Sequence, residues 1–135
     1  MTSRRSFLAL GAGLSVLTLL APAALAAEEK KKGGGLSYVQ MPALTATVFR
    51  ADGRRGVMTV EVGVDIANNG LRNRAQISLP RLRAAYVQML QAYASGLGAG
   101  QAPSADYIST ALQKETDRVL GEPGGKLLLG TILVN

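Results

Sequence analysis

The sequence predicts an α+β domain with the element order β-β-α-α-β, in which two helices pack on one face of a small antiparallel or mixed three-stranded sheet. Residues 57–66 alternate between apolar and polar side chains, which is typical of a strand with one buried face. Residues 79–93 instead repeat large apolar side chains at helical spacing, and such a stripe must be buried against a partner. We expect one domain over residues 36–135, because a chain of 135 residues is too short for two.

The first strand is predicted over residues 38–50, with an interruption at Pro42. Proline lacks the N–H that a strand ladder needs, so it is found at edges and at strand starts. Beyond Pro42 the side chains alternate, with Leu44, Ala46 and Val48 on one face and Thr45, Thr47 and Phe49 on the other. The Asp52-Gly53 pair then predicts a turn, so the first two strands form an antiparallel hairpin.

The second strand, residues 57–66, has the clearest pattern in the chain. Its buried face consists of Met58, Val60, Val62, Val64 and Ile66. Its water-facing side consists of Thr59, Glu61, Gly63 and Asp65. The turn before it brings three arginines, Arg50, Arg54 and Arg55, to the tip of the hairpin.

The first long helix opens at Pro80, which fits the first turn because its missing N–H has no partner there. Its buried stripe is predicted to be Leu79, Leu82, Tyr86, Met89, Leu90 and Tyr93, whereas Arg81, Gln88 and Gln91 face water. Residues 71–77 form a short helical lead-in.

Ser104 caps the second helix and Gly121 ends it. Its buried side is predicted to be Tyr107, Ile108, Ala111, Leu112, Val119 and Leu120.

The last strand is predicted over residues 126–134 and is apolar on both faces. Leu127, Leu129 and Leu133 fall on one face, and Leu128, Ile132 and Val134 on the other. Strands of this kind are usually covered on both sides. The strand is therefore either central in the sheet, or its second face meets another subunit, which favours a homo-oligomer.

The N-terminus predicts export. Arg4 and Arg5, followed by Phe7 and Leu8, form a twin-arginine pattern ahead of an apolar run over residues 7–20. The small residues Ala24 and Ala26 suit a signal peptidase, so residues 1–26 are predicted to be a Tat-type signal peptide cleaved after Ala26. The Tat translocase would then be a partner during export to the periplasm. Residues 27–35 are charged and glycine-rich, which is typical of a flexible linker.

Two alternatives to this signal stay open. The arginine pair also occurs by chance in signals of the Sec type. The 21 residues of 7–27 carry no charge, which is long enough for an uncleaved anchor in the inner membrane facing the periplasm. The protein would contact a membrane only if this segment were retained.

The composition argues against several kinds of chemistry. The chain has neither cysteine nor histidine, so disulfides are excluded and zinc, copper and haem sites lose their usual ligands. No carboxylates form a convincing catalytic pair and no serine has a histidine partner, so we expect no enzyme, no cofactor and no metal.

Signal cleavage removes Arg4 and Arg5 and lowers the net charge from +6 to +4. With no tryptophan, nucleic-acid binding is not expected.

The hairpin arginines, Arg50, Arg54 and Arg55, are the candidate partner-binding residues. A second basic set, Arg72, Arg74, Arg81 and Arg83, lies along the first helical region. Together they suit an acidic partner or an anionic glycan, which makes a small periplasmic ligand- or glycan-binding module one hypothesis. The alternative is that these arginines form ordinary solvated surface.

Four segments occur in an informative order. They are a Pro-led strand at residues 41–48, an alternating strand at 54–65, a helix opening with Leu-Pro-Arg-Leu-Arg at 79–90, and a second helix at 112–120 leading into a strand at 127–134. This order, over residues 36–135, resembles the flagellar basal-body-associated FliL family, whose domain is similar to the stomatin-type (SPFH) fold. The resemblance implies a non-catalytic protein that acts through protein–protein contacts, forms rings around the flagellar stator and supports motility. Family members keep a transmembrane helix, whereas this chain carries a cleavage signal.

Overall fold

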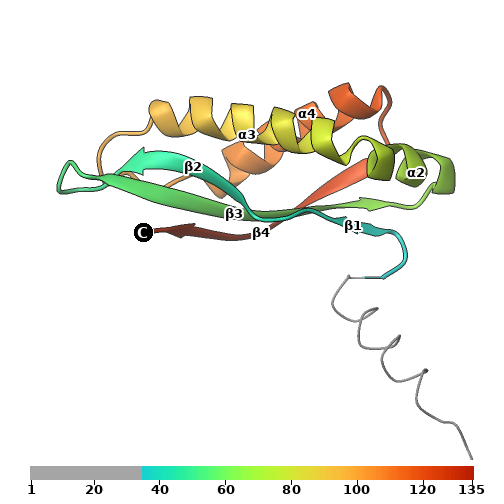
Figure 1. Ribbon diagram of the computed structural model, residues 1–135, viewed down its shortest axis with the longest axis horizontal. Helices are drawn as coiled ribbons and strands as arrows, with labels where there is room; N and C mark the ends of the chain where they lie inside the picture. Colours follow the sequence, from blue (N-terminus) through green and yellow to red (C-terminus); the bar gives the residue numbers. More distant parts are fainter. Residues whose placement is uncertain (1–34) are drawn as a thin grey trace, which may run out of the picture.

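A computed structural model describes residues 35–135 and confirms the α+β fold (Figure 1). The elements are β1 (Tyr38–Gln40), β2 (Leu44–Phe49), β3 (Arg55–Ile66), α2 (Asn69–Ile77), α3 (Leu79–Ser95), α4 (Ala105–Leu120) and β4 (Gly125–Val134). The predicted signal peptide and the predicted linker, apart from Gly35, lie outside the described residues. So do the residues assigned to export, which are Arg4, Arg5, Phe7, Leu8, Ala24 and Ala26.

Strand β3 is the centre of the sheet. Strands β1 and β2 lie end to end along one side of it, and β4 lies along the other. All three pairings are antiparallel. The sheet contains four strands where three were predicted, because the strand expected over residues 38–50 is divided at Pro42. The guanidinium of Arg83 on α3 donates to the Pro42 carbonyl at 3.1 Å, so this break is bonded to a helix.

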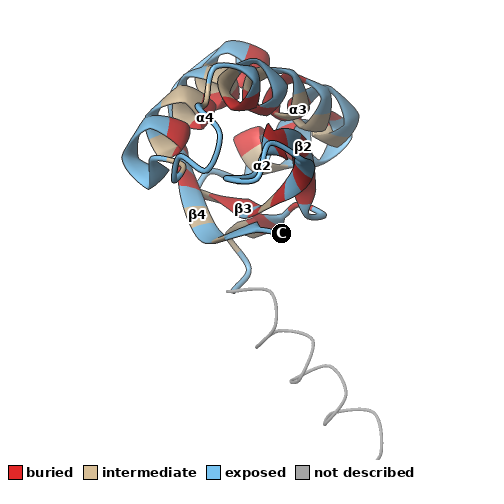
Figure 2. Ribbon diagram, turned by 90° about the vertical axis from the view of Figure 1, so that its left-hand side faces the viewer, coloured by how far each residue is buried: buried red, intermediate tan, exposed pale blue. Residues whose placement is uncertain are grey.

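The helices pack against one face of the sheet and leave the other face open (Figures 1 and 2). The predicted lead-in is a separate helix, α2, so within residues 35–135 three helices instead of two pack against the sheet. It begins because the side chain of Asn68 accepts the N–H of Leu71 at 2.9 Å. Helix α4 begins at the predicted cap, where Ser104 Oγ accepts the Tyr107 N–H at 3.3 Å. It ends at Gly121, whose φ of 81° suits glycine.

The core lies between the helices and the sheet, where Figure 2 shows the buried residues. Every residue of the predicted apolar face of β3 is buried, as are the three predicted on β2. On α3, the side chains of Leu82, Tyr86 and Leu90 are fully buried. The predicted burial of Tyr107 on α4 is wrong: this ring is exposed and stacks on Tyr93, with ring centroids 4.9 Å apart.

Strand β4 differs from its prediction in two ways. It is an edge strand, so of the two predicted alternatives the central position is wrong, and contact of its second face with another subunit stays a prediction. It also contains a β-bulge: Val62 pairs with Leu129 but Val60 pairs with Ile132, so Gly130 and Thr131 together face a single residue of β3. The extra residue reverses the alternation beyond it.

The bulge therefore changes which side chains share a face. Leu127, Leu129, Ile132 and Val134 pair with buried residues of β3 and point towards the helices. Of the large apolar residues of β4, Leu128 and Leu133 are the two that lie on the open face. The predicted grouping, which placed Leu133 with Leu127 and Ile132 with Leu128, is wrong from the bulge onwards.

Side chains from the helices also bond to the sheet edges. Gln91 on α3, which was expected to face water, accepts the Thr47 N–H of β2 at 2.8 Å. Gln113 on α4 accepts the Leu127 N–H and donates to the Gly125 carbonyl, both at 2.8 Å. In the described part of the chain no helix is long and apolar enough to cross a membrane.

Candidate functional site

A cavity of about 620 Å³ lies at the end of the molecule that carries the β2–β3 turn. Three segments that are distant in sequence line it: the end of β2, the loop between α3 and α4, and the end of β4. Helix α3 stops at Ser95, short of this end. The ends of the strands are consequently covered by the loop instead of a helix, and the cavity remains between them.

The loop is fixed against β2 by backbone contact. The Gly100 N–H donates to the Phe49 carbonyl at 3.0 Å. Gly100 has a φ of +73°, and a Cβ at this position would lie 2.9 Å from the Ala51 Cβ, so only glycine suits it. The Tyr93 hydroxyl accepts the Ser104 N–H at 2.7 Å and holds the far end of the loop. The cavity wall is therefore built into the fold.

Among the described residues that line the cavity, Arg50 is the one with a charged side chain. Its aliphatic stem crosses β3 at Gly56, which is buried, and a Cβ on Gly56 would lie 2.9 Å from the Arg50 Cγ. Within residues 35–135 no carboxylate lies within salt-bridge distance of the Arg50 guanidinium. Its positive charge is thus available to a bound anion.

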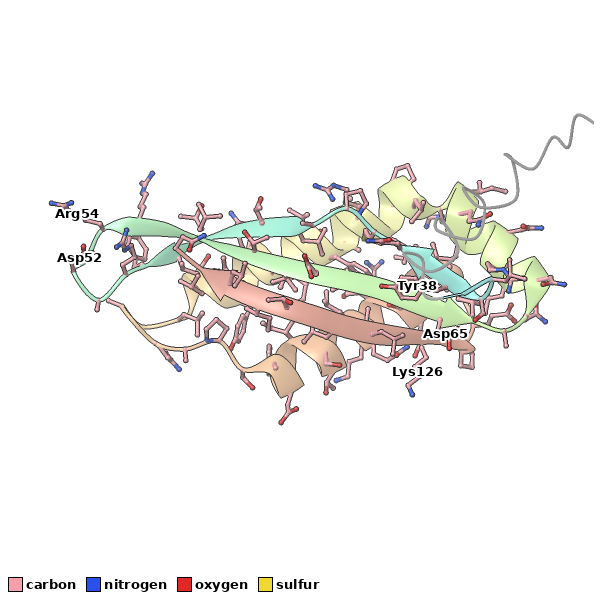
Figure 3. The ribbon with its side chains drawn as sticks, turned by 90° about the horizontal axis from the view of Figure 1, so that it is seen from below. Tyr38, Asp52, Arg54, Asp65 and Lys126 are labelled. Carbon is pink, nitrogen blue, oxygen red and sulfur yellow. The ribbon has the colours of Figure 1, made fainter. Side chains whose placement is uncertain are left out.

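The other two predicted partner-binding arginines lie at the same end but point elsewhere. Arg54 is in the turn, next to Asp52, whose carboxylate accepts the Arg54 N–H at 3.0 Å (Figure 3). Arg55 is the first residue of β3 and pairs with Phe49, which places its side chain on the open face. The three arginines therefore lie at the same end of the domain, as expected, but they do not form a single surface. Of the three, only Arg50 lines the cavity.

The basic set along the helices has mostly structural roles that the sequence did not reveal. Arg72 donates to the Ile66 carbonyl at 2.8 Å, and Arg74 donates to the Leu120 carbonyl at 3.1 Å. Arg83 bonds to the break between β1 and β2, as described above. In the part of the chain seen in the structure, Arg81 is the member of this set whose side chain makes no hydrogen bond or ion pair within the protein.

The open face of the sheet carries a row of exposed apolar side chains. Phe49, Val57 and Leu133 are 46%, 47% and 53% exposed, respectively. Val57 lies opposite Thr47 on one side and Asn135 on the other, so Phe49 and Leu133 are its diagonal neighbours on the same face. We call these three residues the open-face row.

The other end of the open face is more polar. Tyr38, Asp65 and Lys126 lie there, away from Asp52 and Arg54 at the turn (Figure 3). The ring of Tyr38 fills the space that a Cβ on Gly63 would occupy, which explains why Gly63 is buried on this uncovered face. Asp65 lies opposite Lys126 in the register of β3 and β4. Apart from Leu128, the large exposed apolar side chains of the strands on this face therefore lie near the turn.

Two features bear on chemistry. Among residues 35–135, no three acidic side chains are grouped so that they could hold a metal ion. Burial raises the pKa of the Tyr86 phenol above its ordinary 10.0, with a smaller contribution from the nearby carboxylates of Asp117 and Glu115 and an opposing one from the hydrogen bond to Thr116. Because Tyr86 is fully buried in the core, it belongs to the packing and not to a surface site.

No protein-family model and no curated protein matches this chain.

Proposed function

We propose that this protein is a non-catalytic domain that works through protein–protein contacts, with the open face of the sheet as its contact surface. The open-face row carries the proposal. Large apolar side chains are costly to leave in water, and exposed groups of them often mark protein interfaces. Arg55 lies directly beside Phe49 in the register, and arginine and aromatic residues are enriched in such interfaces.

We infer that a second copy of the chain is the first partner to test. The exposed apolar surface of the open face consists of the open-face row and, towards the other end, of Leu128. In addition, within residues 35–135 no strand pairs with the outer side of β4, so strand addition could occur there beyond the Leu127 N–H and the Gly125 carbonyl, which are bonded to Gln113. A homo-oligomer would cover both features at once.

The flagellar version of this function is a narrower proposal. Its support is the element order, which agrees with what the FliL resemblance implies: a Pro-interrupted strand, a long alternating strand, helices and a final strand. In that version the partners are flagellar stator components and the location is the periplasm, reached by the export signal at Arg4 and Arg5.

A motility assay tests this version. A deletion strain is expected to swim more slowly, and expression of the unaltered chain to restore its speed. A chain with Val57→Asp and Leu133→Asp should not restore it, because both charges lie on the open face. Ile77→Asp, at an apolar side chain that is 83% exposed on α2, is the matched control and should restore swimming. Unaltered swimming in the deletion strain would remove the flagellar proposal.

The mature N-terminus tests the proposed export. Intact mass of the protein from the cell that makes it should show a chain beginning at Ala27, and fractionation should place it in the periplasm. A full-length chain in the inner membrane would instead support the anchored alternative.

The second candidate function is a periplasmic ligand-binding module. The cavity beside Arg50 favours it, since small-molecule sites are concave, largely apolar and carry few polar groups. For the broader glycan-binding form, charge reversal at Arg50, Arg54 and Arg55 together should abolish binding of anionic glycans. Unchanged binding would exclude these residues.

A further inference from the structure

We propose that the cavity at the turn end binds a small molecule with an apolar body and a single carboxylate, which pairs with the Arg50 guanidinium. The cavity volume of about 620 Å³ lies within the range of roughly 300–1,000 Å³ that is typical of small-molecule sites.

The lining supports an aliphatic occupant. The larger apolar side chains of the lining come from all three segments: Val48, Phe49, Leu97, Pro103, Ile132 and Val134. Ile132 and Val134 point to this side of the sheet only because the bulge in β4 reverses the alternation. Val134 remains 46% exposed even so, which is the expected result where no helix covers the strand. An acyl chain would cover this surface.

The charge supports a carboxylate. A guanidinium presents two parallel N–H groups that match the two oxygens of a carboxylate. Arg50 supplies one positive charge, and its side chain is the one charged side chain among the described residues that line the cavity. One monovalent anion is therefore balanced, whereas a doubly charged phosphate would be left with excess negative charge in a partly apolar site.

The site is also ordered before binding. Gly100 fixes the loop to β2, and Gly56 allows the stem of Arg50 to lie against β3. A preformed site loses less free energy on binding than one that must be assembled. The proposal can be tested apart from the contact surface described above. Val48, Ile132 and Val134 line the cavity from the helix side of the sheet, whereas Val57 and Leu133 lie on the other side and do not line it. Phe49 is shared by the cavity lining and the open-face row.

Octanoate is a suitable probe and octanol its neutral counterpart, both added to the isotope-labelled full chain below their micelle-forming concentrations. Amide shifts should saturate with octanoate and concentrate at the cavity, for example at Ala51, Gln101 and Asn135. Octanol should bind at least about tenfold more weakly, as expected for loss of one charge-assisted hydrogen-bonded pair.

Three variants complete the test. Arg50→Gln should weaken octanoate binding at least about tenfold and leave octanol binding unchanged. Arg54→Gln is the matched control, since it removes the same charge at the same end but outside the cavity, and it should leave both affinities unchanged. Ala102→Trp, at an exposed loop position in the lining, should fill the cavity and remove binding of both probes.

Four results would overturn the proposal: no saturable binding of octanoate, equal affinities for octanoate and octanol, equal losses in the two arginine variants, or shifts confined to Val57 and Leu133 on the open face. The last result would assign the probe to the contact surface, and none of the four would weaken the protein-contact proposal itself.

Discussion

Tyr86 and Thr116 show how two hydroxyl groups are accommodated in an otherwise apolar core. Both side chains are fully buried, and their oxygens are hydrogen-bonded to each other. Thr116 Oγ1 also donates to the Leu112 carbonyl at 2.7 Å, so Tyr86 is the donor in the shared bond. Each hydroxyl therefore has a partner, which is the condition for burying a polar group without a large cost.

Removing either partner should have different effects. Tyr86→Phe leaves Thr116 bonded to Leu112 and should lower the free energy of unfolding by about 1 kcal/mol. Thr116→Val leaves the Tyr86 hydroxyl without an acceptor and should cost more, about 1–3 kcal/mol. Urea unfolding of both variants measures the difference. If Tyr86→Phe lowered the free energy of unfolding more than Thr116→Val, the assignment of Tyr86 as the donor and Thr116 as its acceptor would be wrong.

The raised pKa of Tyr86 predicts a pH dependence of stability. Above pH 10.0 the unfolded chain loses the phenolic proton, whereas the folded chain retains it because burial opposes the charge. The unfolded state then binds fewer protons, so the free energy of unfolding falls as the pH rises above 10.0. Urea unfolding measured at several pH values below and above 10.0 tests this. As the pH rises above 10.0, the free energy of unfolding should fall more steeply for the wild type than for Tyr86→Phe. Parallel slopes would contradict the assignment.

Gly56 provides a test of the close contact at the turn end. Gly56→Ala would push a methyl group against the Asn135 carbonyl and the Arg50 stem, and should cost about 1–3 kcal/mol. Gly96→Ala is the control: its Cβ would meet nothing closer than 3.6 Å, so stability should change little. Thermal unfolding distinguishes the two. If both are tolerated equally, Gly56 does not position Arg50.

At the scale of elements, glutamine side chains replace missing strand neighbours. Gln91 bonds to the outer edge of β2, and Gln113 bonds twice to the outer edge of β4. An unpaired strand edge otherwise exposes its N–H and C=O groups. The helices thus stabilise the sheet by these bonds in addition to apolar packing.

Gln113→Ala should lower the free energy of unfolding by about 1–3 kcal/mol, because it leaves the Leu127 N–H and the Gly125 carbonyl without their partner. Gln88→Ala, at an exposed position on α3, should change it by less than about 0.5 kcal/mol. Hydrogen exchange adds a local measurement, since the Leu127 amide should exchange faster only in the first variant. Equal effects of the two substitutions would show that edge bonding contributes little.

The elements that the sequence predicted well are those with a strong period. The alternation in β3 and the apolar stripe of α3 are both found in the structure, and so are the caps at Ser104 and Gly121. The bulge in β4 could not be predicted from the sequence pattern. Residues 127–134 are apolar on both faces of the strand, so an extra residue does not interrupt any alternation between apolar and polar side chains. The roles of Gln91 and Gln113 depend on contacts between distant segments, which local periodicity does not contain.

At the scale of the whole molecule, one end of the domain carries two adjoining surfaces that share Phe49. The open-face row lies on the uncovered side of the sheet, and the cavity with Arg50 lies on the helix side. The sequence located three arginines at this end correctly but not their directions. Arg50 and Arg55 point to opposite faces because the hairpin register places Arg55 across from Phe49. The cavity itself requires β2, β4 and the α3–α4 loop to meet, so no single segment indicates it.

Sedimentation equilibrium of the purified full chain tests the central claim most directly, namely that the open face of the sheet is a protein-contact surface. The account predicts a wild-type mass above that of the monomer that falls on dilution, a monomer for Leu133→Asp, and wild-type behaviour for the control Ile77→Asp. A wild-type monomer at every concentration, or a Leu133→Asp variant that associates as strongly as the wild type, would contradict it.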